Sequence, residues 1–259
     1  MRFQPFQLLL ILLSGLVLLF IVGPLAGMFI STTPAQIFES SKDPDVQRSI
    51  GLTLWVSMAA TFAFALGGIP LAYLLARHDF VLKRLILGII DLPIVIPHSA
   101  AGIAILGFVS RDSYLGKLGS MIELDFVGAP AGIAIAMAFV SIPYLISSAR
   151  DGFLSVPLRL EQAALNLGAS PSRVFFTISL PLAWRNVVSG LILMFARGMS
   201  EFGAIVIIAY HPMVTPVLIW ERFNSFGLGY ARPVAVIFIL VSLMFFITLR
   251  FLSRSRKDA

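Results

Sequence analysis

Two ionisable residues stand four positions apart inside a strongly apolar segment, Arg197 and Glu201 in FARGMSEFGA. At this spacing a helix places both side chains on one face, where their charges neutralise each other. An ionisable residue inside a membrane span is a candidate functional group, but a paired bridge that fixes helix packing explains the same pattern. A lone arginine would hold an anion too tightly for release, so the pairing favours a weak, transient contact.

A second group of polar residues and prolines lies in DLPIVIPHS, with Asp91, Pro93, Pro97 and His98. Each proline removes a backbone donor and disfavours helix in the residue before it, which predicts a broken helix. The freed carbonyl groups must face protein or a water-filled path. His98 could donate to an anion or shuttle protons with Asp91, but we expect it to bind the freed carbonyl groups instead. The candidate residues of a translocation pathway or gate are Asp91, Pro93, Pro97, His98, Arg197 and Glu201.

The sequence contains no motif for nucleotide binding or metal binding. The segment LGKLGS at 115–120 has neither the earlier glycine nor the Ser or Thr after Lys117 that a phosphate-binding loop requires. His78 and His211 lack metal-ligand partners at helical spacing, and the chain has no cysteine. We therefore predict no enzyme, no metal site and no cofactor in this chain, so that any ATP hydrolysis takes place on another chain.

The elements that position these residues are expected to be membrane-spanning helices. Of the 259 residues 58% are hydrophobic and 12% charged, well beyond a soluble domain at roughly 45–50% apolar. The apolar run after Phe6 is too long for a cleaved signal peptide. We predict an all-α integral membrane protein forming a single domain, 1–259. Its six transmembrane helices are expected at about 6–30, 49–76, 85–109, 129–149, 186–209 and 233–251.

Lys and Arg residues predict the orientation, because they are retained on the cytoplasmic side. One side carries Arg2, Arg77, Lys83, Arg84, Arg150, Arg159, Arg173, Arg185, Arg250, Arg254, Arg256 and Lys257. The other side carries Lys42, Arg48, Arg111, Lys117, Arg222 and Arg232. We therefore expect both termini in the cytoplasm of a plasma-membrane protein. The net charge of +6 is then a sign of topology and not of nucleic-acid binding.

The longest polar interruption, residues 155–181, predicts a cytoplasmic helical hairpin. Pro157 suits a first helical turn and Gly168 a left-handed helix end, which gives a first helix at about 157–167. Ser170 and Pro171 repeat the start signal, and Pro181 is expected to end the second segment. The first helix has a small apolar face, formed by Leu160, Ala163, Ala164 and Leu167. Such a face could lie in the lipid interface or enter a groove on a partner.

The spacing of this loop resembles the E-A-A…G…L-P loop of permease subunits of ATP-binding-cassette importers, which docks on the ATPase. The matching residues are Glu161, Gln162, Ala163, Ala164, Gly168, Leu180 and Pro181, of which Gln162 departs mildly from the common form. The segments at 91–106 and 196–223 resemble oxyanion permeases, and most of all the molybdate/tungstate type. This resemblance implies a type I importer permease fold and places Glu161 at the rim of the ATPase groove.

The resemblance also implies the partners: a second copy of the chain in a homodimer, two ATPase subunits that bind ATP and Mg²⁺, and an external oxyanion-binding protein. A sulfate or related oxyanion permease is the alternative within this class. From a different class, an ion- or proton-coupled secondary carrier would use Asp91, His98, Arg197 and Glu201. A membrane enzyme or an assembly factor is a more remote alternative.

Overall fold

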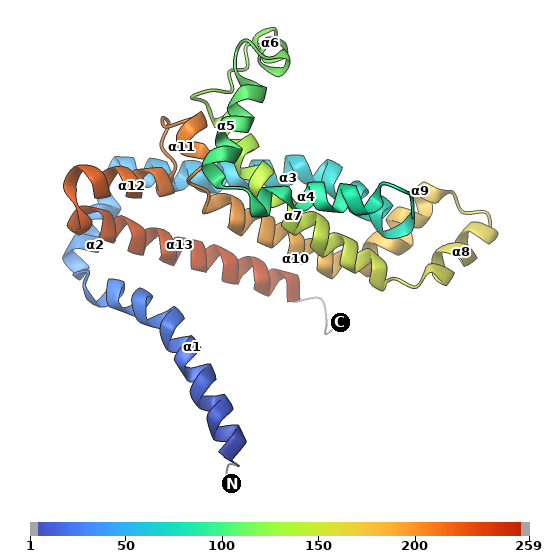
Figure 1. Cartoon of the computed structure of the whole chain (residues 1–259), viewed down its shortest axis with the longest axis horizontal. Coiled ribbons are helices and arrows are strands. Elements are labelled where there is room, and N and C mark those ends of the chain that lie inside the picture. The colour runs from blue at the N-terminus through green and yellow to red at the C-terminus, as the bar shows by residue number, and fades with distance from the viewer. Residues whose placement is uncertain (1–4, 255–259) are drawn as a thin grey trace.

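Long helices, most of them running side by side, make up the body of the protein (Figure 1). The computed structural model describes residues 5–254, and every regular element within them is helical. Five stretches are long and apolar enough to cross a membrane. They are α1 (Pro5–Ile30), α3 (Pro44–Arg77), α7 (Pro130–Ser155), the continuous run Pro171–Met199 that ends with α10 (Leu180–Met199), and α13 (Leu228–Arg254). If the bent pair α4 (Lys83–Val95) and α5 (His98–Val109) counts as one span, the described residues contain six candidate spans. The chain is therefore a multi-pass membrane protein with the predicted all-α fold.

The core lies where α7 packs between α3 and α10. Val56, Met137 and Met194, one from each helix, are almost completely buried there. Ser57 on α3 donates a hydrogen bond of 2.9 Å to the carbonyl of Phe195 on α10, which fixes the level at which these two helices meet. Hydroxyl contacts of this kind join helices where lipid cannot supply a partner.

The predicted break in the third apolar segment is confirmed. The axes of α4 and α5 are bent by 113°, and α5 carries the short helix α6 (Tyr114–Ser120) away from the bundle (Figure 1). Pro93 remains inside α4, whereas Pro97 caps the start of α5. A Cβ atom at Gly203 would lie 2.8 Å from the Cβ of His98, so the absence of a side chain there lets the start of α5 approach the segment after α10.

The predicted bounds of the fifth span, 186–209, are wrong at both ends. Helix α9 (Pro171–Val174), a π-helical turn at Phe175–Ser179 and α10 form one run, so Pro181 does not end a segment. Pro181 is the second residue of α10 and lies directly after the π-helical turn, so the helical run continues through it. The chain leaves this run after Met199 and forms α11 (Ile205–Ile208) before α12 (Thr215–Phe226).

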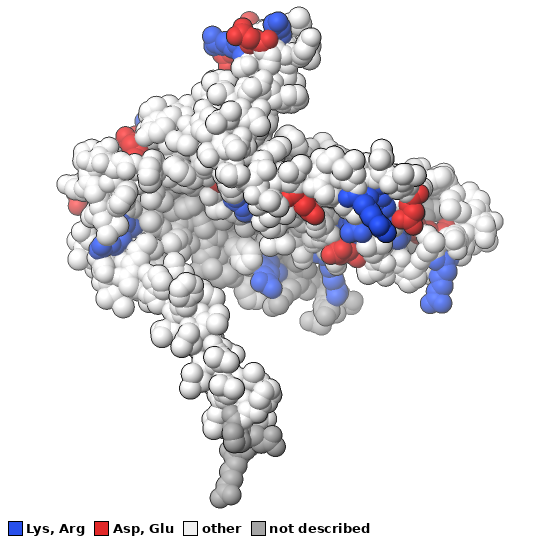
Figure 2. Space-filling view, viewed as in Figure 1, with Lys and Arg blue, Asp and Glu red and all other residues white. Residues whose placement is uncertain are grey.

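The two ends of the long helices carry different polar groups. Helix α8 (Leu158–Asn166) and α9 lie at one end, and α2 (Pro34–Lys42) and α12 lie at the other (Figure 1). At the α2 end, Arg222 bonds Asp43 at 2.6 Å and Arg232 bonds the carbonyl of Ser31. Figure 2 shows charged side chains near α8 and α9 and at the tip formed by α6, while most of the other visible surface is uncharged. Arg2, Arg256 and Lys257, used above for orientation, lie outside the described residues.

Helix α1 extends away from the rest of the protein, touching it mainly near α13 (Figure 1). Its apolar window is unburied along its whole length. In water such a surface would be strongly unfavourable, which agrees with a helix surrounded by lipid or by another membrane protein.

Candidate functional site

The segment after α7 forms the predicted two-helix hairpin. Helix α8 begins after Pro157 and ends at Asn166, within a residue of the predicted bounds. Gly168 has φ +88°, a conformation that costs a residue with a Cβ atom roughly 1 kcal/mol or more, so its expected left-handed role is confirmed. Ser170 then caps α9 by accepting a hydrogen bond from the backbone N–H of Arg173. The chain therefore reverses direction in a short, well-defined turn.

The apolar face of α8 points out of the protein. Leu160, Ala163 and Leu167 are exposed, and Ala164 is partly exposed. Of the other residues in the predicted coupling loop, Gln162 and Pro181 are exposed and Leu180 is partly buried at the start of α10. A polar end of the molecule thus presents an apolar patch of small and medium-sized side chains, the kind of surface that binds another protein.

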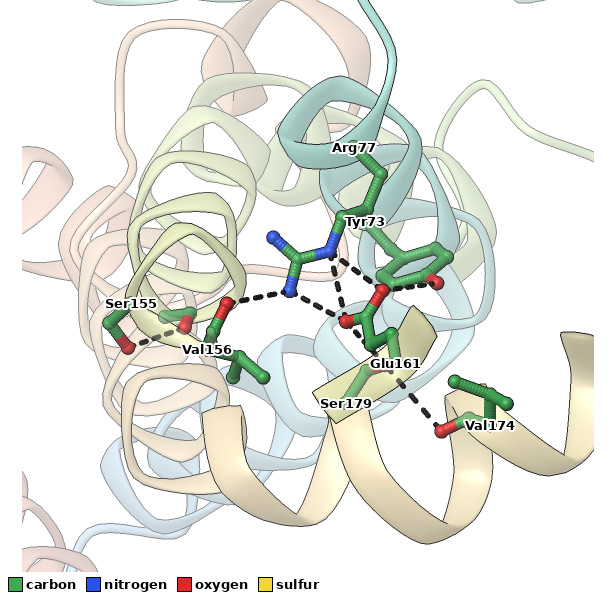
Figure 3. Close-up of polar contacts among 8 residues, drawn as sticks. Tyr73, Arg77, Ser155, Val156, Glu161, Val174 and Ser179 are labelled. Atoms are coloured by element: carbon green, nitrogen blue, oxygen red, sulfur yellow. Dashed lines mark hydrogen bonds and ion pairs between the residues drawn. The ribbon is translucent and has the colours of Figure 1, made fainter. Parts of the chain in front are cut away.

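Glu161 borders this face of α8, but its side chain is buried against its own chain (Figure 3). The Nε of Arg77 donates to both carboxylate oxygens of Glu161 at 2.9 and 3.0 Å, and Nη2 donates to Oε1 at 2.6 Å. Ser179 donates to Oε1 at 2.8 Å, and the Tyr73 hydroxyl lies 3.3 Å from Oε2. Arg77 Nη2 also donates to the carbonyl of Val156. We call these four side chains, Tyr73, Arg77, Glu161 and Ser179, the hairpin clamp.

The hairpin clamp joins three parts of the chain: the end of α3, helix α8 and the π-helical turn before α10. The side chains of Arg77 and Glu161 are 8% and 5% exposed, so water has little access to their charges. Around them Tyr73, Phe153 and Phe175 meet in a set of ring contacts at centroid distances of 4.9 to 6.0 Å. The hairpin is therefore attached to the membrane helices by a buried ion pair and an aromatic cluster.

The expectation that Glu161 stands at the rim of an ATPase groove stays a prediction, but the structure shows that this side chain is buried against its own chain. Its carboxylate satisfies a cation and two hydroxyl groups of its own chain, and this leaves the neighbouring alanines as the outward surface. Sequence reasoning missed Arg77, Tyr73 and Ser179 because Arg77 was read as a sign of orientation alone. An acidic residue beside an apolar helix face was the available signal, because burying it requires a cation from the same side of the membrane.

The second candidate cluster forms where α10 ends and α5 begins. Arg197 Nη2 lies 3.1 Å from Glu201 Oε2, which confirms the predicted pairing. Glu201 Oε2 also lies 2.7 Å from His98 Nδ1, and Arg197 Nη2 lies 2.9 Å from His98 Nε2. Glu201 Oε1 accepts the backbone N–H of Ala204 at 2.9 Å. We call Arg197, Glu201 and His98 the inner triad.

The expected bonds between His98 and carbonyl groups freed by the prolines were wrong. The ring instead binds the two charged residues of the inner triad, which are about a hundred positions away in the sequence. Asp91 is exposed and makes no hydrogen bond or ion pair with the residues the structure describes, so it is separate from His98. The break therefore positions His98, as Pro97 caps α5 directly before it.

The inner triad lies well inside the bundle along its length. Ser57 on α3 contacts Phe195, which lies two residues before Arg197, so Ser57 marks the level of the triad along α3. At 1.5 Å per residue, Ser57 is about 20 Å from the Pro44 end of α3 and about 30 Å from its Arg77 end. Residues 5–254 contain no group of three or more His, Cys, Asp or Glu side chains arranged to hold a metal ion. The chemistry available at the inner triad is thus charge and hydrogen bonding.

Known proteins with similar sequences point to one class. Residues 68–258 match the family described as "Binding-protein-dependent transport system inner membrane component". The chain is 40% identical over 253 residues to the "Molybdate/tungstate transport system permease protein WtpB" of Methanocaldococcus jannaschii, covering 98% of this chain and 99% of the relative. The protein of the same name from Pyrococcus abyssi is 45% identical over 219 residues, 83% and 82% of the two chains. A "Sulfate transport system permease protein CysT" of Synechococcus elongatus is similar at 29% identity, covering 85% and 82%.

Among solved structures, a bacterial ABC transporter "involved in the import of the acidic polysaccharide alginate" contains a chain with the same fold. The TM-score is 0.75 at 17% identity, over 98% of this chain and 96% of that one. At this identity the likeness concerns the fold alone. The fold predicted from the sequence, that of an importer permease, is therefore confirmed.

Proposed function

We propose a function from one premise: the chain belongs to the family of binding-protein-dependent transport system inner membrane components. It is the membrane-spanning permease subunit of an ATP-driven importer, acting as a single transmembrane domain with both termini in the cytoplasm. Its substrate is a tetrahedral oxyanion, molybdate or tungstate, as in the relatives that share 40–45% of its residues. Sulfate is the second candidate, favoured by relatives of lower identity.

The observation that carries the proposal is the hairpin, which presents an apolar face outward and is bound inward by the hairpin clamp. A surface that receives force from a partner needs both properties, because a loosely attached loop would move without moving the helices. We infer that Ala163, Ala164 and Gly168 contact an ATPase subunit and that Glu161 holds the hairpin to α3. Gln162, Leu180 and Pro181 flank this contact.

The assembly is proposed to hold two copies of this chain, two ATPase subunits that bind ATP and Mg²⁺, and an external oxyanion-binding protein. The pathway is proposed to pass the break between α4 and α5, with Pro93 and Pro97 shaping it and the inner triad beside it. Asp91 is retained as a pathway candidate, separate from the triad. A secondary carrier would not need the hairpin, and this favours the ATP-driven importer.

The test is reconstitution of the full chain with its ATPase and binding protein in liposomes. Gly168→Val and Ala164→Trp should each weaken co-purification of the ATPase or uncouple ATP hydrolysis from oxyanion uptake, while the protein still inserts in the membrane. Gly227→Val is the matched control. Gly227 has φ +82° and no neighbour within 4 Å, like Gly168, but lies at the other end of the bundle. Normal coupling in both hairpin variants would reduce the hairpin to an interfacial helix pair and overturn the proposal.

A further inference from the structure

The inner triad has a defined arrangement of donors and acceptors. An ionised Glu201 accepts hydrogen bonds and cannot donate, so the Nδ1 of His98, at 2.7 Å from Oε2, carries the proton of that bond. Arg197 Nη2, which donates and cannot accept, lies 2.9 Å from Nε2 and 3.0 Å from Nδ1 of His98, so it is shared between the two ring nitrogens.

Burial within the triad is uneven. Glu201 is completely buried, whereas the side chains of Arg197 and His98 are 23% and 39% exposed. The carboxylate of Glu201 therefore lies beneath the surface, whereas the side chains of Arg197 and His98 reach the surface. A guanidinium group at this depth is too costly to leave in lipid, so it must face a water-filled path or another protein.

Part of the Arg197 guanidinium is uncommitted. Nη2 serves Glu201 and His98, Nη1 reaches the hydroxyl of Ser200 at a long 3.5 Å, and Nε makes no hydrogen bond to the described residues. These N–H groups on Nε and Nη1 lie on different edges of the guanidinium, so each can donate one charge-assisted hydrogen bond to an oxygen of a tetrahedral oxyanion. The first turn of the twelve-residue helix α5, which begins at His98, adds the positive end of its dipole beside Arg197.

We propose that Arg197 and His98 form a weak binding site for a divalent tetrahedral oxyanion inside the membrane, and that Glu201 limits its affinity. This inference rests on the proposed function for the class of anion. Conduction requires a site that attracts an ion yet releases it. A dianion beside an unopposed guanidinium in a medium of low dielectric constant would be held strongly, and the buried carboxylate offsets most of that attraction. Glu201 is thus a positioning and tuning residue that does not touch the anion.

Histidine NMR tests the site directly, because the chain has three histidines, His78, His98 and His211. The full chain is labelled with ¹⁵N-histidine, placed in lipid nanodiscs and titrated with tungstate, with chloride at equal ionic strength as the reference. The His98 signal, assigned by its loss in His98→Gln, should shift and saturate at about 1 mM or above, the range of a weak site. His78, exposed after α3, should not shift.

Arg197→Gln with Glu201→Gln removes both charges, keeps a polar side chain at each position and leaves no orphaned ion. This variant should fold, lose the His98 response and take up oxyanion about tenfold more slowly or worse, since a charged donor contributes about a factor of ten. Glu201→Gln alone should tighten tungstate binding by a similar factor. The matched control, Arg77→Gln with Glu161→Gln, removes the other buried pair and should leave the His98 response unchanged.

A His98 signal that ignores tungstate far above the millimolar range, or that shifts equally in the Arg197→Gln, Glu201→Gln protein, would overturn the site. If the parent complex still imports oxyanion in that case, the proposed function stands and this inference alone fails. If the parent complex imports no oxyanion, the proposed function fails, whatever His98 does.

Discussion

The hairpin clamp and the inner triad are both built on a buried glutamate and an arginine, yet they differ in access to the surface. At the clamp both charges are enclosed, and Glu161 is bound by side chains from two other parts of the chain. At the triad the carboxylate is enclosed, but the arginine and the histidine reach the surface. A closed pair fixes two elements relative to each other, whereas an open pair leaves a cation for a further ligand. The burial of the arginine therefore decides whether a Glu–Arg pair fixes two elements or leaves a cation for a ligand.

The largest effect is expected from opening the closed pair. Glu161→Gln leaves the enclosed Arg77 without its counter-charge, which should destabilise the protein by about 3–5 kcal/mol. Arg77→Gln with Glu161→Gln removes both charges and should recover a good part of that loss. Unfolding of the purified full chain in detergent measures both variants. Equal losses for the single and double changes would mean that the pair does not act as a closed unit.

Replacing the glutamate of the open pair should destabilise the protein less than replacing Glu161. Glu201→Gln leaves Arg197 without its carboxylate, but this side chain reaches the surface and can be solvated there, so we expect about 1–3 kcal/mol. Its folded yield in detergent should still be lower than that of Arg197→Ala with Glu201→Ala, which leaves no unpaired charge. If Glu201→Gln destabilised the protein as much as Glu161→Gln, the contrast between open and closed pairs would be lost.

The break between α4 and α5 places His98 at the open pair, so straightening it should impair that pair without touching the clamp. Pro93→Ala with Pro97→Ala raises helix propensity and should keep the protein in the membrane. Oxyanion uptake in vesicles should fall several-fold, equivalent to about 1 kcal/mol in the rate-limiting barrier. ATPase co-purification serves as the control and should be unchanged. Normal uptake by the folded variant would make the bend a packing feature.

The smallest effect is expected at a third, more exposed pair, Asp43 with Arg222. Burial raises the pKa of Asp43, but the bonds from Arg222 and from the backbone N–H of Asp45 outweigh it, so the pKa lies below its usual value. The ionised carboxylate therefore stabilises the protein above about pH 4, and this contribution is lost as the pH falls through the lowered pKa. Asp43→Asn should cost about 1 kcal/mol or less at neutral pH. A loss as large as that of Glu161→Gln would show that burial does not separate these pairs.

Features governed by neighbouring residues were predictable. The bounds of α8, the left-handed Gly168 and the pairing of Arg197 with Glu201 each depend on residues within one or two helical turns. The end of the fifth span was not predictable in this way. Apart from Ser200, Glu201 and Gly203, the residues from Met199 to Ala209 are apolar, so composition does not mark where the helix stops. The contacts of Glu201 with His98 and Ala204 lie at that point.

The sequence by itself determined that this protein is a helical membrane protein with a hairpin between two spans, because hydropathy, proline and glycine act locally and can be read along the chain. The tertiary structure alone decided that Glu161 faces Arg77, which is 84 positions away, and that His98 meets Glu201, which is 103 positions away. A buried carboxylate requires a cationic partner, but the sequence does not distinguish among the cations on the same side of the membrane. Helix packing selects one of them, since it brings one guanidinium within hydrogen-bonding distance and encloses it.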